Sequence, residues 1–185
     1  MILPISCFGS PILRAKTKNV SFDQSTKDLI HNMWETMYNA NGVGLAAPQV
    51  NKDLRLFIID TSSFQDDNDF PNHIPLKEVF INPIIKKEEG ERWEFNEGCL
   101  SIPDIREYVK RKSVIHIDFY DENFKLKSKK YTGINARVIQ HEYDHLNGVL
   151  FIDKISVLKK RMINRKLKDI TKGKFNTSYK IRLFK

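Results

Sequence analysis

The sequence has few cysteines and no long apolar run. Its 185 residues include only two cysteines, Cys7 and Cys99. A structural disulfide between them is not expected in a reducing compartment, so each thiol is considered separately. No apolar stretch approaches the roughly 20 residues that span a membrane. The first residues also lack the basic and apolar segments of a signal peptide. We therefore expect a cytoplasmic protein with no membrane partner.

Acidic residues are scarce near the C-terminus. The chain has 31 Lys and Arg against 23 Asp and Glu. After Asp153 the many basic residues are accompanied by a single acidic residue, Asp169. This segment predicts either the solvated face of an amphipathic helix or a contact with the phosphates of the ribosome. It lacks the combined aromatic and basic pattern of an RNA-binding module, so no sequence-specific nucleic-acid partner is expected.

Histidines are also few, and two of the five lie in His141-Glu142-Tyr143-Asp144-His145. The apolar spacing around this H-E-x-x-H motif predicts a helix, on which positions i and i+4 share one face. Two imidazoles placed in this way can bind one metal ion, and Glu142 is positioned to act on a water at the metal. The alternative is a pair of exposed histidines beside solvating acids.

The third metal ligand is not obvious from the motif. No histidine or glutamate follows His145, so the downstream ligand of the common H-E-x-x-H peptidases is missing. Asp144 and Asp153 remain, but Asp144 points about 60° away from His141 on an ideal helix. Cys99 is the better candidate, because a sulfur with two imidazoles leaves an open fourth position for water. The alternative is that Cys99 is a small buried apolar residue.

The predicted elements define an α+β protein. We expect a single compact domain over residues 1–185, with mostly antiparallel strands packed around the central H-E-x-x-H helix, and with an N-terminal and a C-terminal helix. Residues 154–185 form the basic C-terminal helix and an edge strand in this prediction. Helices are expected at 25–39, 133–146 and 156–171, strands at 55–60, 78–82, 114–120, 125–131 and 178–184, and a hairpin at 84–95 that turns at Glu89-Gly90.

A run of small residues, Gly42-Val-Gly-Leu-Ala-Ala-Pro-Gln49, precedes the first predicted strand. Its glycines allow another backbone to approach closely, and Pro48 disfavours a helix. We expect a loop that forms the wall of an extended substrate site.

Three motifs together resemble those of peptide deformylases. They are the run from Gly42 to Gln49, Glu97-Gly-Cys-Leu-Ser101, and Gln140-His-Glu-Tyr-Asp-His145. The resemblance extends from residue 2 to about residue 160. It implies a hydrolase that removes the formyl group from the N-terminal formylmethionine of nascent polypeptides and releases formate.

The resemblance also implies roles for individual residues. Cys99, His141 and His145 would hold one divalent metal ion, most often Fe(II), with Zn, Ni or Co also accepted. Glu142 would act as the general base and acid, while Gln49 and the Leu100 N–H bind the oxyanion.

The nascent N-formylmethionyl peptide would lie along the glycine-rich segment. By resemblance, its first side chain enters an apolar pocket with Arg106 or Tyr108 near the mouth. Arg137 does not suit an apolar wall, so it either points outward or pairs with an acid. Glu97 is expected to pair with Arg111. The substrate-binding residues implied in this way are Gly42, Val43, Gly44 and Val138, beside Leu100 and His141.

Two other functions fit part of the sequence. An H-E-x-x-H metallopeptidase would share the helix but requires a downstream ligand. A non-catalytic ribosome-binding or RNA-binding homologue would account for the basic segment, but it would give Glu142 no role.

Overall fold

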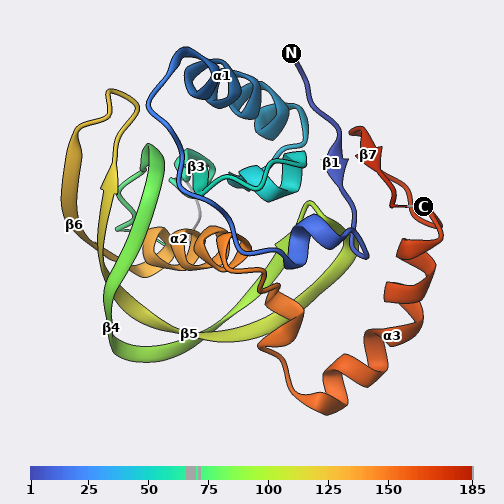
Figure 1. Ribbon diagram of the computed structural model, residues 1–185. Coiled ribbons are helices and arrows are strands. Elements are labelled where there is room, and N and C mark those ends of the chain that lie inside the picture. The colour runs from blue at the N-terminus through green and yellow to red at the C-terminus, as the bar shows by residue number, and fades with distance from the viewer. Residues whose placement is uncertain (66–69, 71, 185) are drawn as a thin grey trace.

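The computed structural model describes residues 1–65, 70 and 72–184, in an arrangement of helices around one curved sheet (Figure 1). Within these residues, three α-helices, α1, α2 and α3, accompany seven strands and four short 3₁₀ helices. Their bounds are β1 Ile5–Ser6, η1 Pro11–Arg14, α1 Gln24–Asn39, β2 Gly44–Ala46, η2 Ala47–Val50, β3 Leu56–Asp60, η3 Ser62–Phe64, β4 Lys77–Cys99, β5 Ile102–Tyr120, β6 Leu126–Thr132, α2 Gly133–Leu146, η4 Phe151–Asp153, α3 Val157–Thr171 and β7 Ile181–Arg182.

The main sheet has the strand order β2-β3-β4-β5-β6, and every neighbouring pair in it is antiparallel. Strands β4 and β5 form one long hairpin that curves past α2 in Figure 1. Its tight turn lies at Leu100 and Ser101, since Cys99 pairs with Ile102. The predicted turn at Glu89-Gly90 is therefore wrong. The predicted α+β class with mostly antiparallel strands is confirmed.

Local distortions let β4 continue through residues that usually end a strand. The pairing with β5 shifts register between Ile81 and Ile84, on either side of Pro83. There Asn82 has φ 49° and its side chain bonds the backbone of Val20. Another shift, between Glu89 and Arg92, spans Gly90, whose φ of +78° suits glycine. These bulges bend the strand without ending it.

Helix α2 is packed against the concave side of the sheet. Its buried apolar residues join side chains of β3, β4, β5 and β6 in one cluster. Because one face of α2 is committed to this core, the adjacent face points toward the end of the β4–β5 hairpin. The sheet and the helix thus bring the H-E-x-x-H residues close to Cys99.

The other two helices begin at capping side chains. Asp23 accepts a hydrogen bond from the Thr26 N–H at the start of α1 (2.9 Å), as Ser156 does from Lys159 in α3 (3.2 Å). Among the described residues, no helix is long and apolar enough to cross a membrane.

The two ends of the chain meet in a separate small sheet. Strand β7 pairs with β1 in parallel, with Ile5 opposite Ile181. Both strands lie on the same side of the molecule in Figure 1. The C-terminal segment does contain a strand, as predicted, but it does not extend the edge of the main sheet.

Candidate metal centre and substrate cleft

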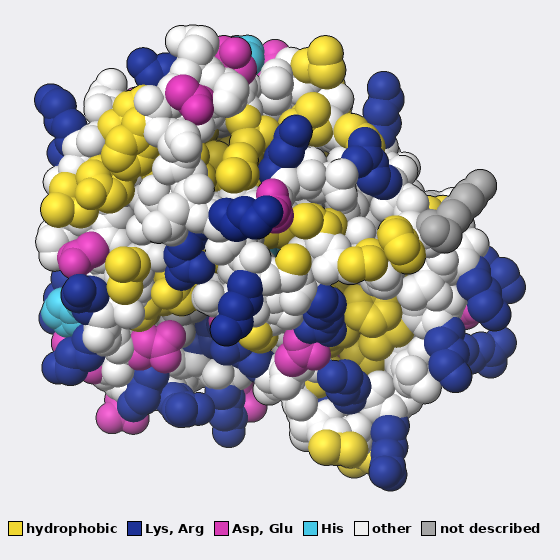
Figure 2. Space-filling view, in the orientation of Figure 1, with side chains coloured by type: hydrophobic (Ala, Val, Ile, Leu, Met, Phe, Trp, Pro, Cys, Tyr) yellow, Lys and Arg dark blue, Asp and Glu magenta, His cyan; other side chains and the backbone are white. Residues whose placement is uncertain are grey.

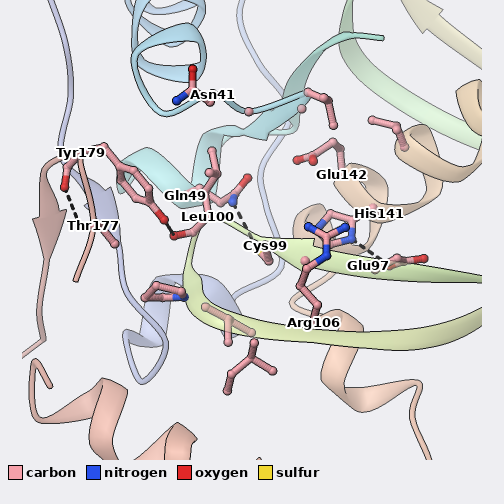
Figure 3. Close-up of a pocket in the computed structure, with 18 of the residues that line it drawn as sticks. Asn41, Gln49, Glu97, Cys99, Leu100, Arg106, His141, Glu142, Thr177 and Tyr179 are labelled. Carbon is pink, nitrogen blue, oxygen red and sulfur yellow. Dashed lines mark hydrogen bonds and ion pairs between the residues drawn. The ribbon is translucent and has the colours of Figure 1, made fainter. Parts of the chain in front are cut away.

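A cleft of about 660 Å³ opens between five parts of the chain. The segment around β2 forms one wall, and the tip of the β4–β5 hairpin forms another. Residues of η3, of α2 and of the segment after α3 complete it. Figure 3 shows side chains from four of these parts directed into the same space.

Three side chains that could hold a metal meet beside this cleft. Cys99 stands at the end of β4, and His141 and His145 lie one turn apart on α2. Their ligand atoms all lie within 4.8 Å of one another, and Cys99 Sγ is 3.3 Å from His145 Nε2. One sulfur and two imidazole nitrogens at this spacing suit Zn²⁺, Fe²⁺ or a related divalent ion. The donor set therefore fits a metal centre.

Glu97 fixes the orientation of one of these histidines. Its Oε2 lies 3.0 Å from His141 Nδ1, which leaves His141 Nε2 free to face the cleft. Metal-binding histidines commonly have such a carboxylate on the second nitrogen. Glu97 also accepts hydrogen bonds from Arg111 Nε (2.7 Å) and Arg137 Nη1 (2.9 Å). Burial opposes its charge, but the bonds from Arg111 and His141 prevail and lower the pKa of Glu97.

Arg137 is buried and does not point outward. Besides its bond to Glu97, it donates to the carbonyl oxygens of Val109 (3.0 Å) and Trp93 (2.6 Å). Its guanidinium lies 4.4 Å from the centre of the Trp93 indole ring. Of the two alternatives that the sequence left open, pairing with an acid is the one found.

The neighbours of the motif have structural contacts. Asp144 accepts a hydrogen bond from Arg111 (2.6 Å) and forms an ion pair with Lys154 (3.2 Å). Gln140 donates to the Lys112 and Ala136 carbonyl oxygens at 2.9 and 3.0 Å. Neither side chain belongs to the metal cluster.

Glu142 is buried beside the metal cluster. Its Oε2 has no hydrogen-bond partner within the described part of the chain. Burial raises the pKa of Glu142 to about 7, although the nearby charges of His141 and Arg111 act in the opposite direction. A carboxylate with this pKa can both accept and return a proton near neutral pH.

Gln49 is held with its amide nitrogen toward the metal cluster. Its Oε1 accepts a hydrogen bond from the Ala46 N–H at 2.8 Å. Its Nε2 is thereby directed to Ser101 Oγ (3.3 Å) and Cys99 Sγ (3.5 Å). Leu100 follows Cys99 at the hairpin turn, so its backbone lies beside the same cluster (Figure 3).

The two histidines differ in their electrostatics. Burial disfavours a charge on His141, but Cys99 and Glu97 outweigh it and raise the pKa well above its usual value. Burial and the neighbouring charge of His141 lower the pKa of His145 well below the usual value.

Every residue that the sequence indicated for the substrate site lines the cleft, apart from Tyr108. Tyr108 is an exposed side chain on β5, and Arg106 lies at the cleft in its place. Sequence reasoning missed several lining residues on η3, β4 and β5 and in the C-terminal segment, none of which belongs to a motif. They are Phe64, Phe95, Ile102, Ile105, Asn176, Thr177, Ser178 and Tyr179.

A sulfur and two imidazoles beside a buried glutamate define a metal-binding hydrolase of the H-E-x-x-H class. The family model described as polypeptide deformylase matches residues 2–161, and the chain therefore belongs to the peptide deformylase family. As a member, it is a metalloenzyme, and the predicted family and enzyme class are confirmed.

Known members of the family are similar to this chain over nearly its full length. The peptide deformylase of Christiangramia forsetii is 52% identical over 98% of this chain and 96% of its own length. That of Flavobacterium johnsoniae is 54% identical over the same shares. A crystal structure of a peptide deformylase from Legionella pneumophila has a TM-score of 0.81 at 38% identity, and covers 93% of this chain and 96% of that one.

Proposed function

We propose that this chain removes the formyl group from the N-terminal formylmethionine of nascent polypeptides and releases formate. The observation that carries the proposal is the cluster of Cys99, His141 and His145 beside the buried Glu142 at a cleft. Family membership supports the same activity.

In this proposal Cys99, His141 and His145 hold one divalent metal ion. Their donor atoms are close enough to share one ion, and Glu97 presents His141 in the required orientation. A bound divalent ion supplies Lewis-acid chemistry, which acidifies a water and polarises the formyl oxygen. We propose Fe(II) as the ion in the cell on the basis of family membership. Zn, Ni or Co are proposed as substitutes, because a sulfur and two nitrogens suit all four metals.

In this proposal, Glu142 transfers a proton from the attacking water to the leaving amine. Its raised pKa lets the carboxylate take a proton from the attacking water. The same carboxyl group then donates that proton to the amine nitrogen as the C–N bond breaks. The products are formate and a peptide with a free amino terminus.

Gln49 and the Leu100 N–H stabilise the developing negative charge on the formyl oxygen. The Gln49 amide cannot rotate freely, since its oxygen is bound to the Ala46 N–H. Donors that are fixed before the reaction stabilise an oxyanion without having to reorganise.

The peptide lies along β2, which is an edge strand of the main sheet. An extended chain can add to such an edge through backbone hydrogen bonds at residues 42–44. Val43 and Val138 provide apolar surface for the methionine side chain. Because Gly44 lies directly against Glu142, this edge delivers the formyl group to the proposed base.

The basic C-terminal helix is the proposed ribosome contact, in the cytoplasm. Arg161, Arg165 and Lys168 are exposed on α3, where Figure 2 shows Lys and Arg side chains beside apolar ones. Attraction to RNA phosphates falls steeply with salt. Replacing these three residues by Glu should abolish salt-sensitive binding to ribosomes without changing turnover of a free peptide. Equal binding by the variant and the parent would reject the contact.

An anaerobic assay tests the activity. The chain, loaded with Fe(II), Ni(II) or Zn(II), is given formyl-Met-Ala-Ser, acetyl-Met-Ala-Ser and an unstructured protein substrate. We expect formate and a free amine from the first and no cleavage of the others. Cleavage of internal peptide bonds without formate release would favour a metallopeptidase, and no turnover in any metal form would favour a non-catalytic homologue.

A further inference from the structure

The segment after α3 returns to the cleft. Residues 176–179 line it, although they lie beyond residues 2–161, which the family model matches. The segment is also held in place by the other end of the chain. Ile5 N–H donates to the Lys180 carbonyl (2.8 Å), and Cys7 N–H donates to that of Arg182 (2.9 Å).

Within this segment, Tyr179 reaches the tip of the β4–β5 hairpin. Its hydroxyl donates a hydrogen bond to the Leu100 carbonyl oxygen at 2.9 Å, as Figure 3 shows. The adjacent carbonyl, that of Ser101, accepts a hydrogen bond from the Phe8 N–H at 2.8 Å. The two ends of the chain therefore bind the two carbonyl groups of the hairpin turn.

The Tyr179 ring is itself restrained. Tyr179 and Leu100 are both partly buried against the same apolar core cluster, together with Ile181. The pairing of β7 with β1 places Ile181 opposite Ile5. A hydroxyl on a ring packed in this way fixes its partner better than a mobile side chain would, because less rotamer freedom is lost when the bond forms.

Leu100 is consequently held from both sides. Its N–H belongs to the peptide plane that follows Cys99, and the sulfur of Cys99 is a proposed metal ligand. Its carbonyl belongs to the next peptide plane, which Tyr179 holds. Fixing both planes restricts the two backbone dihedrals of Leu100, and so fixes the direction of the N–H.

We propose that Tyr179 is a positioning residue for the Leu100 N–H, the backbone donor to the oxyanion. This inference rests on the proposed function. An interaction that strengthens only in the transition state changes kcat and leaves KM unchanged. In this proposal Tyr179 acts through its hydrogen bond to Leu100.

The test compares Tyr179→Phe with Tyr38→Phe. Tyr38 also donates one hydroxyl hydrogen bond, to Asp60 Oδ2 (2.7 Å), and does not line the cleft. With formyl-Met-Ala-Ser, we expect kcat of Tyr179→Phe to fall about five-fold at unchanged KM. A decrease of this size corresponds to the contribution of one neutral hydrogen bond. Tyr38→Phe should retain the parent kcat.

A second measurement does not depend on turnover. Amide hydrogen exchange of the zinc-loaded proteins should become faster at Leu100 in Tyr179→Phe, and should be unchanged at Ile117 in β5. Exchange that rises equally at both amides would indicate general loosening and overturn the inference. So would a parent-like kcat, or a higher KM at unchanged kcat. Failure of the parent protein to release formate would instead reject the proposed function, and Leu100 exchange would still report the positioning contact.

Discussion

The carboxylate of Glu97 is surrounded by cationic and imidazole side chains. Arg111, Arg137 and His141 all bind it at 2.7 to 3.0 Å, and the Glu97 side chain is almost completely buried. Buried charges are stable only when they are paired in this way. A carboxylate beside His141 Nδ1 favours the tautomer that carries its proton on Nδ1, and this tautomer offers Nε2 to a metal.

Replacing Glu97 tests this arrangement. In Glu97→Gln the neutral amide cannot hold three donors, and we expect the affinity for zinc to fall about 10- to 100-fold. Competition with a chromophoric chelator measures the affinity. Glu94→Gln is the matched control, because Glu94 lies on the same strand but forms a surface ion pair with Lys110 (3.6 Å). Equal zinc affinity in the two variants would contradict the role of Glu97.

Strand β2 lies close against helix α2 at Gly44. A Cβ atom on Gly44 would lie 2.5 Å from Glu142 Oε1 and 2.8 Å from its Cδ. A residue without a Cβ is therefore needed here for Glu142 to keep its observed position. The sequence suggested close backbone approach in this run, but it could not indicate that Glu142 is the group approached.

An alanine at this position should displace the proposed base. We expect Gly44→Ala to lower kcat by about 100-fold, as a shift of roughly 1 Å in a catalytic group can do. Metal content should not change, because the three heavy atoms nearest that Cβ all belong to Glu142 and not to a metal ligand. Steady-state kinetics together with metal analysis give both quantities. A variant with parent-like kcat would show that Glu142 need not occupy its observed position.

Across the whole molecule, short-range patterns were predictable and long-range pairing was not. Helical spacing predicted α1, α2 and α3 to within a few residues, and two motifs indicated the metal cluster. The continuity of β4 was not predictable, because Pro83 and Gly90 usually end strands and only the pairing with β5 tolerates them. Likewise, nothing local to Tyr179 indicates that it binds Leu100, which is 79 residues away.

An ion pair that joins distant parts of the chain makes the stability depend on pH. Arg14 binds Asp153, which also accepts hydrogen bonds from the Leu150 N–H (2.9 Å) and from Lys160 (3.1 Å). Burial alone would raise the pKa of Asp153, but these bonds prevail and lower it below 3.8. The stabilisation is therefore complete above about pH 4 and is lost as the pH falls through the lowered pKa.

Asp153→Asn should be less stable than the parent by about 1 kcal/mol at pH 7, a modest value because both partners are partly exposed. The difference should shrink as the pH falls below 4. Urea unfolding at several pH values measures it, and Asp28→Asn, an exposed position on α1, serves as the control. A difference that stayed constant down to pH 2 would contradict the assigned pKa direction.

In the proposed mechanism, Cys99, His141 and His145 hold the metal and Glu142 transfers the proton. The most direct test of this mechanism measures metal content and formate release in Glu142→Ala, with Cys99→Ala alongside. We predict that Glu142→Ala binds one equivalent of metal and releases no formate from formyl-Met-Ala-Ser, whereas Cys99→Ala loses both properties. Parent-like turnover by Glu142→Ala, or full metal occupancy in Cys99→Ala, would contradict the account.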